Sequence, residues 1–150
     1  MLGTLFDTKI WIASVFKLHP FHRAAQQKLE HATPASPAVF CRSTEQSFLR
    51  LITNNKILKF YEVESLTNRV AILQLHKLLA MSQVRFQDEP AGTTAMWHSI
   101  AALNTPSPRV WMDAYLAAFA ISGGLQLLTT DKDFKAYERH GLALTLIDPT

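Results

Sequence analysis

The sequence predicts a single α/β domain with a central, mainly parallel sheet that helices cover on both faces. Short apolar segments alternate with helical patterns along the chain, and these segments lack the clean polar alternation of half-exposed strands, which favours buried parallel strands. The 150 residues suit one domain, spanning 1–150, better than two. At 48% hydrophobic and 18% charged, the composition is far from that of disordered chains.

The first quarter of the chain reads as strand, helix, helix and strand. Leu2 to Phe6 is a short apolar run that ends at Asp7, after which apolar residues recur at helical spacing. His19-Pro20 ends this helix, because the residue before proline avoids the α region. Phe21 to Ala32 is expected to form a second helix, and Ala38 to Cys41 a second strand.

The next segment contains two predicted helix starts. Ser43 and Gln46 have the spacing of a capping box, which opens a helix that runs to Asn54-Asn55. Ser65 is expected to cap a long helix, followed by a short strand over Val84 to Phe86. The residues of this long helix predicted to face the core are Val70, Leu73, Leu78 and Leu79.

The last third of the chain predicts two more helices and two more strands. A helix over Thr93 to Leu103 is broken by prolines, and an apolar helix over Met112 to Ser122 is stopped by two glycines. Leu125 to Leu128 is typical of a buried strand, and Leu142 to Ile147 forms the last apolar run. The longest uninterrupted apolar run, Ala114 to Ile121, is too short to cross a bilayer.

Composition excludes some classes of protein. No secretion signal is recognisable at the start of the chain, so we expect a soluble, cytoplasmic protein with no membrane association. A single cysteine, Cys41, permits no internal disulfide and has no metal-ligand spacing around it. The net charge of +3 favours anionic partners only mildly.

Acidic residues follow the predicted strands at the edge where parallel α/β sheets place their functional crevice. Asp7 follows the first strand, Glu45 stands in the first turn after the second, and Asp131 follows the strand that ends at Leu128. Asp113 interrupts an otherwise hydrophobic helix. Taken alone, each acid can be explained without any function, either as a helix cap or as a charge that complements the helix dipole.

Taken together, the acids predict a metal site. Carboxylates gathered at one edge repel each other, so they must take up protons or bind cations. Oxygen ligands without cysteine or histidine suit Mg²⁺ or Mn²⁺, which also bind substrate phosphates. This chemistry indicates phosphoryl hydrolysis. The histidine pair His19 and His22 lacks a second ligand pair at a spacing typical of zinc.

Four segments contain the acids. In chain order they are Leu5-Phe6-Asp7-Thr8-Lys9-Ile10-Trp11, Thr44-Glu45-Gln46-Ser47-Phe48-Leu49-Arg50-Leu51-Ile52-Thr53-Asn54, Asp113-Ala114-Tyr115-Leu116-Ala117-Ala118-Phe119-Ala120 and Thr129-Thr130-Asp131-Lys132-Asp133-Phe134. With these segments in this order, the chain resembles the PIN-domain ribonucleases, and within that family the VapC toxins of VapBC toxin–antitoxin modules. The resemblance covers nearly the whole chain. It implies a three-layer α/β/α fold and a Mg²⁺- or Mn²⁺-dependent endoribonuclease that is the toxin of a type II toxin–antitoxin system.

The same resemblance implies roles for the acids. The catalytic, metal-binding quartet would be Asp7, Glu45, Asp113 and Asp131, with Asp133 as an auxiliary acid. In a two-metal scheme Asp7 and Asp131 are the first candidates for ligands, and Glu45 is either a ligand or the base that orients the attacking water. Thr8 and Thr130 either hydrogen-bond the carboxylates or the substrate phosphate, or satisfy local backbone groups.

The first motif departs from the family, since most relatives carry Asp-Thr-Asn where this chain has Asp7-Thr8-Lys9. Lys9 either contacts the scissile phosphate or Asp133, or weakens metal affinity. The absence of a second acid two residues after Asp7 disfavours a haloacid-dehalogenase-type phosphatase.

The cations predicted to hold the RNA backbone are Lys9, Arg42, Arg109 and Lys132; the alternative is that they are ordinary surface charges. Trp11, Trp97 and Trp111 either stack on bases or fill the core.

The family resemblance also implies a homodimer and a cognate VapB-type antitoxin whose C-terminal segment wraps the toxin. Apolar residues of the first helices either form the antitoxin groove or belong to the core. They are Trp11, Val15, Phe16, Phe21 and the Phe48 to Ile52 face. Two other functions stay open: a non-catalytic PIN-like domain that acts as an RNA-binding or assembly scaffold, and a structure-specific DNA nuclease.

Overall fold

A central sheet of five parallel strands organises the fold. The computed structural model describes residues 2–147. The strands are ordered β3-β2-β1-β4-β5, and all neighbours pair in parallel. Their bounds are β1 Thr4–Phe6, β2 Ala38–Phe40, β3 Val84–Phe86, β4 Gln126–Thr129 and β5 Ala143–Leu146. The predicted α/β class is therefore confirmed, and β1 lies at the centre, where the strand order reverses between β2 and β4.

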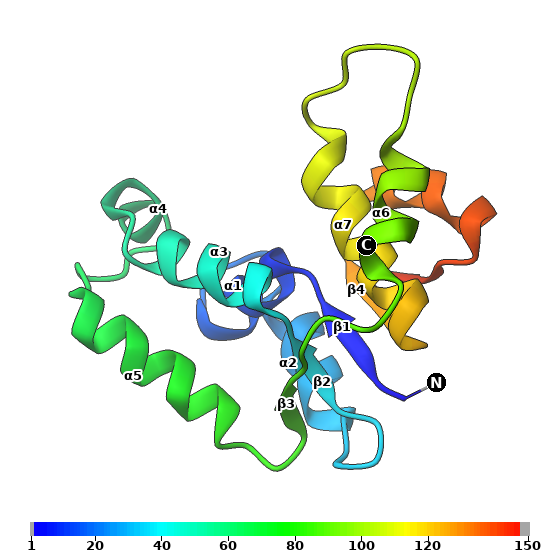
Figure 1. Ribbon diagram of the computed structural model, residues 1–150. Helices are drawn as coiled ribbons and strands as arrows, with labels where there is room; N and C mark the ends of the chain where they lie inside the picture. Colours follow the sequence, from blue (N-terminus) through cyan, green and yellow to red (C-terminus); the bar gives the residue numbers. More distant parts are fainter. Residues whose placement is uncertain (1, 148–150) are drawn as a thin grey trace.

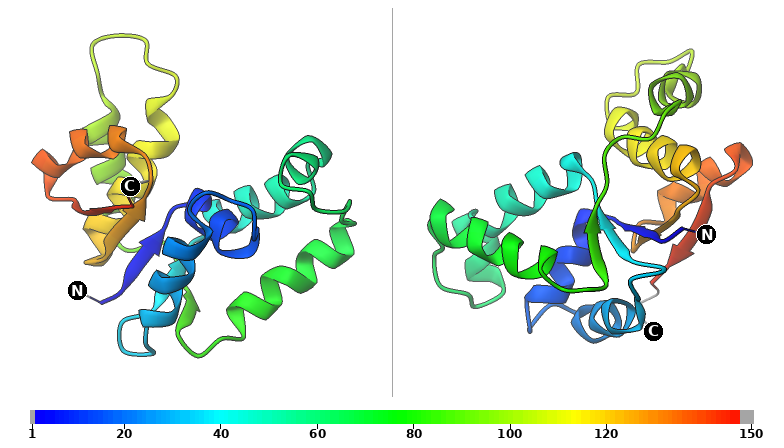
Figure 2. Two further views of the ribbon diagram at one scale, coloured as in Figure 1. Left: turned by 180° about the vertical axis from the view of Figure 1, so that it is seen from behind. Right: turned by 60° about the horizontal axis from the view of Figure 1, so that its bottom comes forward.

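Helices cover both faces of this sheet, which gives three layers (Figures 1 and 2). The helices packed in the first core are α1 Thr8–Val15, α2 His22–His31, α3 Arg42–Ile52, α4 Asn55–Phe60 and α5 Asn68–Leu79. The second core contains α6 Thr93–Ala101, α7 Val110–Gly123 and the 3₁₀ helix η1 Lys132–His140. The two sets of helices lie on opposite sides of β1 in Figure 1.

The strands supply side chains to both cores in turn, because successive residues of a strand point to opposite faces. Phe6, Phe40 and Leu128 enter the first core, whereas Leu5, Val39 and Leu127 enter the second. In the first core the ring of Trp11 stacks on that of Phe40, with centroids 3.8 Å apart and planes 5° apart. This pair fixes α1 against the sheet and thereby fixes the direction in which the chain leaves β1.

Two predicted helix starts are wrong. Helix α3 begins after Cys41, where the Cys41 amide donates to the Thr44 hydroxyl at 3.0 Å, so the capping pair is Cys41 and Thr44 instead of Ser43 and Gln46. Helix α5 begins after Thr67 and not Ser65, because the Thr67 hydroxyl accepts the Val70 amide.

Other details of the middle of the chain also differ from the prediction. Leu73 is 53% exposed, whereas Ala71, Leu75 and Leu78 form the buried stripe of α5, and Val70 and Leu79 are partly buried. The short helix α4 was not predicted; the Asn54 side chain caps it by accepting two backbone amides. The helix η1 was not predicted either. Ala114–Ile121 lies within α7, and no helix of residues 2–147 is long and apolar enough to span a membrane.

Candidate active site

Asp7 lies at the carboxyl end of the central strand, in the N-cap position of α1. Its side chain makes no capping hydrogen bond. Instead, the hydroxyl of Thr129, at the end of the neighbouring strand β4, donates to Asp7 Oδ2 at 2.8 Å. Asp7 is buried, and burial raises the pKa of its carboxyl, while the Thr129 hydrogen bond and the charge of Lys9 oppose that rise. Asp7 is therefore more than a helix cap.

Thr129 connects Asp7 to a second acid. The same hydroxyl oxygen accepts the backbone amide of Asp131 at 3.1 Å. Asp131 is the N-cap of η1, and its Oδ1 accepts the Asp133 amide at 2.9 Å, so the predicted capping role is real for this residue. Thr129 is fully buried. It hydrogen-bonds two acids at the strand order reversal, a role that the sequence offered as one alternative for Thr8 and Thr130 and did not consider for Thr129.

Asp113 joins these two acids from the first turn of α7. It is partly buried, and burial together with the charges of Asp7 and Asp131 raises its pKa to about 6, whereas Lys9 opposes the rise. The charge of Asp133 also raises the pKa of Asp113, by a smaller amount. Hydrogen bonds therefore link Asp7 through Thr129 to Asp131, and Asp131 to the Asp133 amide, while Asp113 lies near enough for the charges of these acids to raise its pKa.

Glu45 is held differently from the aspartates. Its carboxylate is 2.6 Å from Arg42 Nη1, and the Arg42 guanidinium lies over the Phe86 ring, 4.6 Å from its centroid. Burial raises the pKa of Glu45, and the charges that oppose this rise are those of Arg42 and His76. The structure therefore places Glu45 in an ion pair with Arg42. Its membership of the quartet stays a prediction, as does RNA binding by Arg42.

The acids match a hard divalent cation in chemistry, because they offer only carboxylate oxygens and repel one another. Within residues 2–147, however, no three His, Cys, Asp or Glu side chains are grouped closely enough to hold a metal ion as they stand. Lys9, Arg109 and Lys132 are exposed. Of these, Lys9 is the cation whose charge acts on both Asp7 and Asp113.

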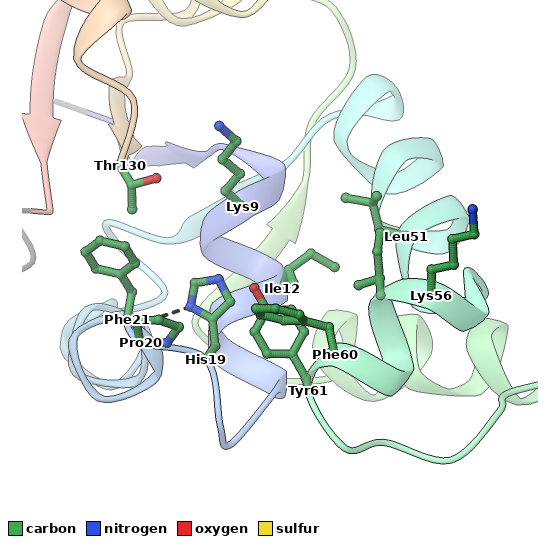
Figure 3. Close-up of a pocket in the computed structure, with 11 residues that line it drawn as sticks. Lys9, Ile12, His19, Pro20, Phe21, Leu51, Lys56, Phe60, Tyr61 and Thr130 are labelled. Atoms are coloured by element: carbon green, nitrogen blue, oxygen red, sulfur yellow. Dashed lines mark hydrogen bonds between the residues drawn. The ribbon is translucent and has the colours of Figure 1, made fainter.

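An apolar groove of about 600 Å³ lies next to this edge (Figure 3). Lys9 and Thr130 line it where it meets the acidic edge. The other lining residues are Ile12, His19, Pro20, Phe21, Leu51, Lys56, Ile57, Phe60 and Tyr61. The His19 ring stacks on Tyr61, with centroids 5.1 Å apart. Phe60 is 77% exposed, so the groove presents aromatic surface to a partner.

Of the apolar residues expected either to form the antitoxin groove or to belong to the core, most belong to the core. Trp11, Phe16, Phe48 and Ile52 are each at most 4% exposed. Phe21 and Leu51 do line the groove, and Val15 packs partly buried against the first core. Sequence periodicity missed Phe60 and Tyr61, because they belong to or follow α4, the helix it did not predict.

The fold and this edge together define a class: an α/β domain with clustered aspartates at the strand order reversal of an all-parallel sheet. Residues 4–140 match the model of the PIN domain family. The chain belongs to the PIN domain family. It is 42% identical over 144 residues to Ribonuclease VapC41 of two Mycobacterium tuberculosis strains, across 95% of this chain and 97% of that protein. It is thus a homologue of the VapC ribonucleases.

Two solved structures have the same fold. One is VapBC2 from Rickettsia felis bound to a DNA fragment from their promoter, with a TM-score of 0.65 and 17% identity, covering 97% of this chain and 98% of that one. The other is a toxin–antitoxin complex from Klebsiella pneumoniae, with a TM-score of 0.57 and 19% identity, covering 99% and 98%. These likenesses confirm the predicted PIN-like α/β/α architecture.

Proposed function

We propose that the protein is a metal-dependent endoribonuclease and the toxin of a type II toxin–antitoxin module. The observation that supports the proposal is the hydrogen-bonded link from Asp7 through Thr129 to Asp131, at the carboxyl ends of β1 and β4, together with a pKa of Asp113 that the charges of both acids help to raise. Clustered carboxylates need cations, and divalent cations serve phosphodiester hydrolysis. The 42% identical relative, which is named a ribonuclease, supports RNA as the substrate.

The residues that would hold Mg²⁺ or Mn²⁺ are Asp7, Asp113 and Asp131, with Asp133 as an auxiliary acid. Glu45, which is paired with Arg42, would serve as a further ligand or as the base that orients the water. When bound, the metal supplies a water of lowered pKa and stabilises negative charge on the leaving oxygen. Thr129 orients Asp7 and favours its ionised form through its 2.8 Å hydrogen bond. Burial and neighbouring acids raise the pKa of Asp113 to about 6, and a bound cation would favour its ionised form.

The exposed cations at this edge would bind the substrate backbone. Lys9 is best placed, since its charge reaches two of the aspartates and its side chain points out of the groove in Figure 3. Arg109 and Lys132 flank Asp113 and Asp131 in the chain, and both are exposed. Phosphate contacts of this kind provide sequence-independent affinity that falls with added salt.

The groove would seat a segment of the cognate antitoxin. It leads from the aromatic residues Phe60 and Tyr61 to Lys9 at the acidic edge, so a peptide lying in it would also cover the catalytic acids. Its floor is apolar and Lys56 lies at its rim, which suits an apolar segment carrying a carboxylate. Both structural neighbours are described as toxin–antitoxin structures. We further propose a homodimer that acts in the cytoplasm, where such modules meet their RNA.

A cleavage assay tests this function. The purified protein is incubated with single-stranded RNA and with single-stranded DNA of the same sequence, while Mg²⁺ and Mn²⁺ are titrated. We expect RNA cleavage that needs the metal, is blocked by chelator, and is lost in Asp7→Asn with the fold intact by circular dichroism. Undiminished cleavage by Asp7→Asn overturns the mechanism. Binding without cleavage supports the scaffold function instead, and preferential DNA cleavage supports a DNA nuclease.

A further inference from the structure

An exposed apolar patch lies at the tip of the hairpin formed by α6 and α7. Its members are Leu103, Trp111 and Met112, which are 44%, 52% and 63% exposed. The connection over residues 102–109 is exposed at all positions except 107, and Figure 1 shows it projecting beyond the helices. Arg109, also exposed, directly precedes α7. We call these four residues the hairpin patch.

Trp111 is held firmly although half of it is open to solvent. The indole Nε1 of Trp97 donates to the Trp111 carbonyl at 2.8 Å, and the two rings meet edge-on with centroids 6.4 Å apart. Trp97 packs in turn against Tyr115, whose hydroxyl donates to Glu89 Oε1 at 2.6 Å. A side chain fixed in this way loses little conformational entropy when a ligand stacks on it.

The patch lies at the same end of α7 as Asp113. Trp111 and Asp113 are two residues apart in the first turn of α7, so their side chains leave the helix on different sides, and Arg109 lies one helical turn before Asp113. The acids are too negative to attract RNA by themselves, so the substrate must be held by groups next to them. An exposed indole with a guanidinium nearby is the combination that single-stranded RNA recognises, by base stacking and by phosphate contact.

We propose that the hairpin patch binds an unpaired RNA base flanking the cleaved phosphate, with Trp111 stacking on the base and Arg109 contacting a phosphate. This inference rests on the proposed ribonuclease function and names how that site holds its substrate. A second copy of the chain is the weaker occupant, because a standard protein interface buries roughly 800 Å² on each partner. Three partly exposed side chains supply far less.

The test measures binding of fluorescein-labelled, single-stranded oligo-U and oligo-A RNA by fluorescence anisotropy, in chelator so that the RNA stays intact. Trp111→Ala is expected to raise the Kd about 5- to 150-fold, the range for loss of one base stack. Trp111→Phe should recover much of the affinity. Arg109→Gln should lower the salt slope of log Kd by about one. The matched control is Ile72→Ala, which removes an exposed apolar side chain of α5, outside the patch and outside the groove, and should leave RNA affinity unchanged.

A second readout separates the possible failures. In the cleavage assay Trp111→Ala should raise KM and leave kcat nearly unchanged, because the ring does not touch the reacting atoms. An unchanged Kd in Trp111→Ala overturns the inference. The inference also fails if Trp111→Ala shifts the protein from dimer to monomer in sedimentation while its RNA affinity is unchanged. That result would assign the patch to a contact between copies of the chain. If the unmodified protein cleaves RNA in either case, only this inference fails and the proposed function stands.

Discussion

Substituting Thr129 by valine tests how the acidic edge is held together. The Thr129 hydroxyl donates to Asp7 at 2.8 Å and accepts the Asp131 amide at 3.1 Å, and the side chain is fully buried. Valine keeps nearly the same volume, so the change removes the two hydrogen bonds and creates little cavity. Asp131 is only partly buried, so water can replace its lost acceptor.

The cost of the substitution follows from the bond to Asp7. A hydrogen bond to a charged group contributes about 1.5 to 3 kcal/mol, so we expect Thr129→Val to lower the free energy of unfolding by about 2 kcal/mol. For a chain of this size, that lowers the Tm by about 4 to 8 °C. RNA cleavage should fall about 10- to 100-fold, as for other residues that orient metal-binding side chains.

Urea denaturation followed by circular dichroism, at several pH values in chelator, measures this effect. The hydrogen bond lowers the pKa of Asp7, so its contribution is present while Asp7 is ionised and shrinks as the pH falls through the pKa of that carboxyl. The matched control is Thr145→Val on β5, whose hydroxyl makes a longer hydrogen bond of 3.3 Å to Gln126 and contacts no acid. If Thr129→Val is no more destabilising than Thr145→Val, and cleaves RNA as well, the reasoning is refuted.

Three further predictions follow from other parts of the structure. Phe60→Asp should weaken binding of the cognate antitoxin at least about 30-fold in calorimetric titration. Ile72→Asp, at a residue that is also exposed but lies outside the groove, should not, and equal effects would place the antitoxin elsewhere. Burial and neighbouring charges raise the pKa of Asp113 to about 6, so ionising it opposes folding, and the metal-free protein should gain stability as the pH falls from about 6 towards 3.8, the ordinary pKa of this carboxyl. Thermal melts in chelator should show this gain reduced in Asp113→Asn, and an identical pH dependence would contradict the assignment. Glu62 has a φ of 56°, a left-handed conformation that costs a residue with a side chain about 1 to 2 kcal/mol. Glu62→Gly should therefore raise the free energy of unfolding by about 0.5 to 1 kcal/mol, whereas the control Glu64→Gly should not. A loss of stability in Glu62→Gly would count against strain at this position.

The sequence was sufficient to predict the layers of the fold because its apolar segments are distinct. Leu5 and Phe6 are adjacent apolar residues that serve opposite cores, and this is what a strand covered on both faces requires. The same apolar segments also predicted that Asp7 and Asp131 directly follow strands. Asp113 stood out because a carboxylate in an apolar helix needs a partner.

Local hydrogen bonds decided what the sequence left undetermined. Ser43 and Cys41 are both near the start of α3, and only the backbone geometry shows that Thr44 closes the cap on Cys41. Thr129 and Thr130 are neighbours in one motif, yet one is fully buried against Asp7 and the other lines the groove. Trp11 and Trp111 both lie in apolar helical patterns, but the first is core and the second is half-exposed. Such differences depend on tertiary neighbours that periodicity does not specify.

Binding of Mn²⁺ to the metal-free protein, followed by electron paramagnetic resonance, tests most directly whether the aspartates form one cation site. The unmodified protein should bind the ion, and Asp7→Asn and Asp113→Asn should each weaken binding at least about tenfold. The control Asp88→Asn alters an exposed acid outside the cluster and should have no effect. Equal Mn²⁺ affinity in all four proteins would show that the gathered carboxylates are not a metal site.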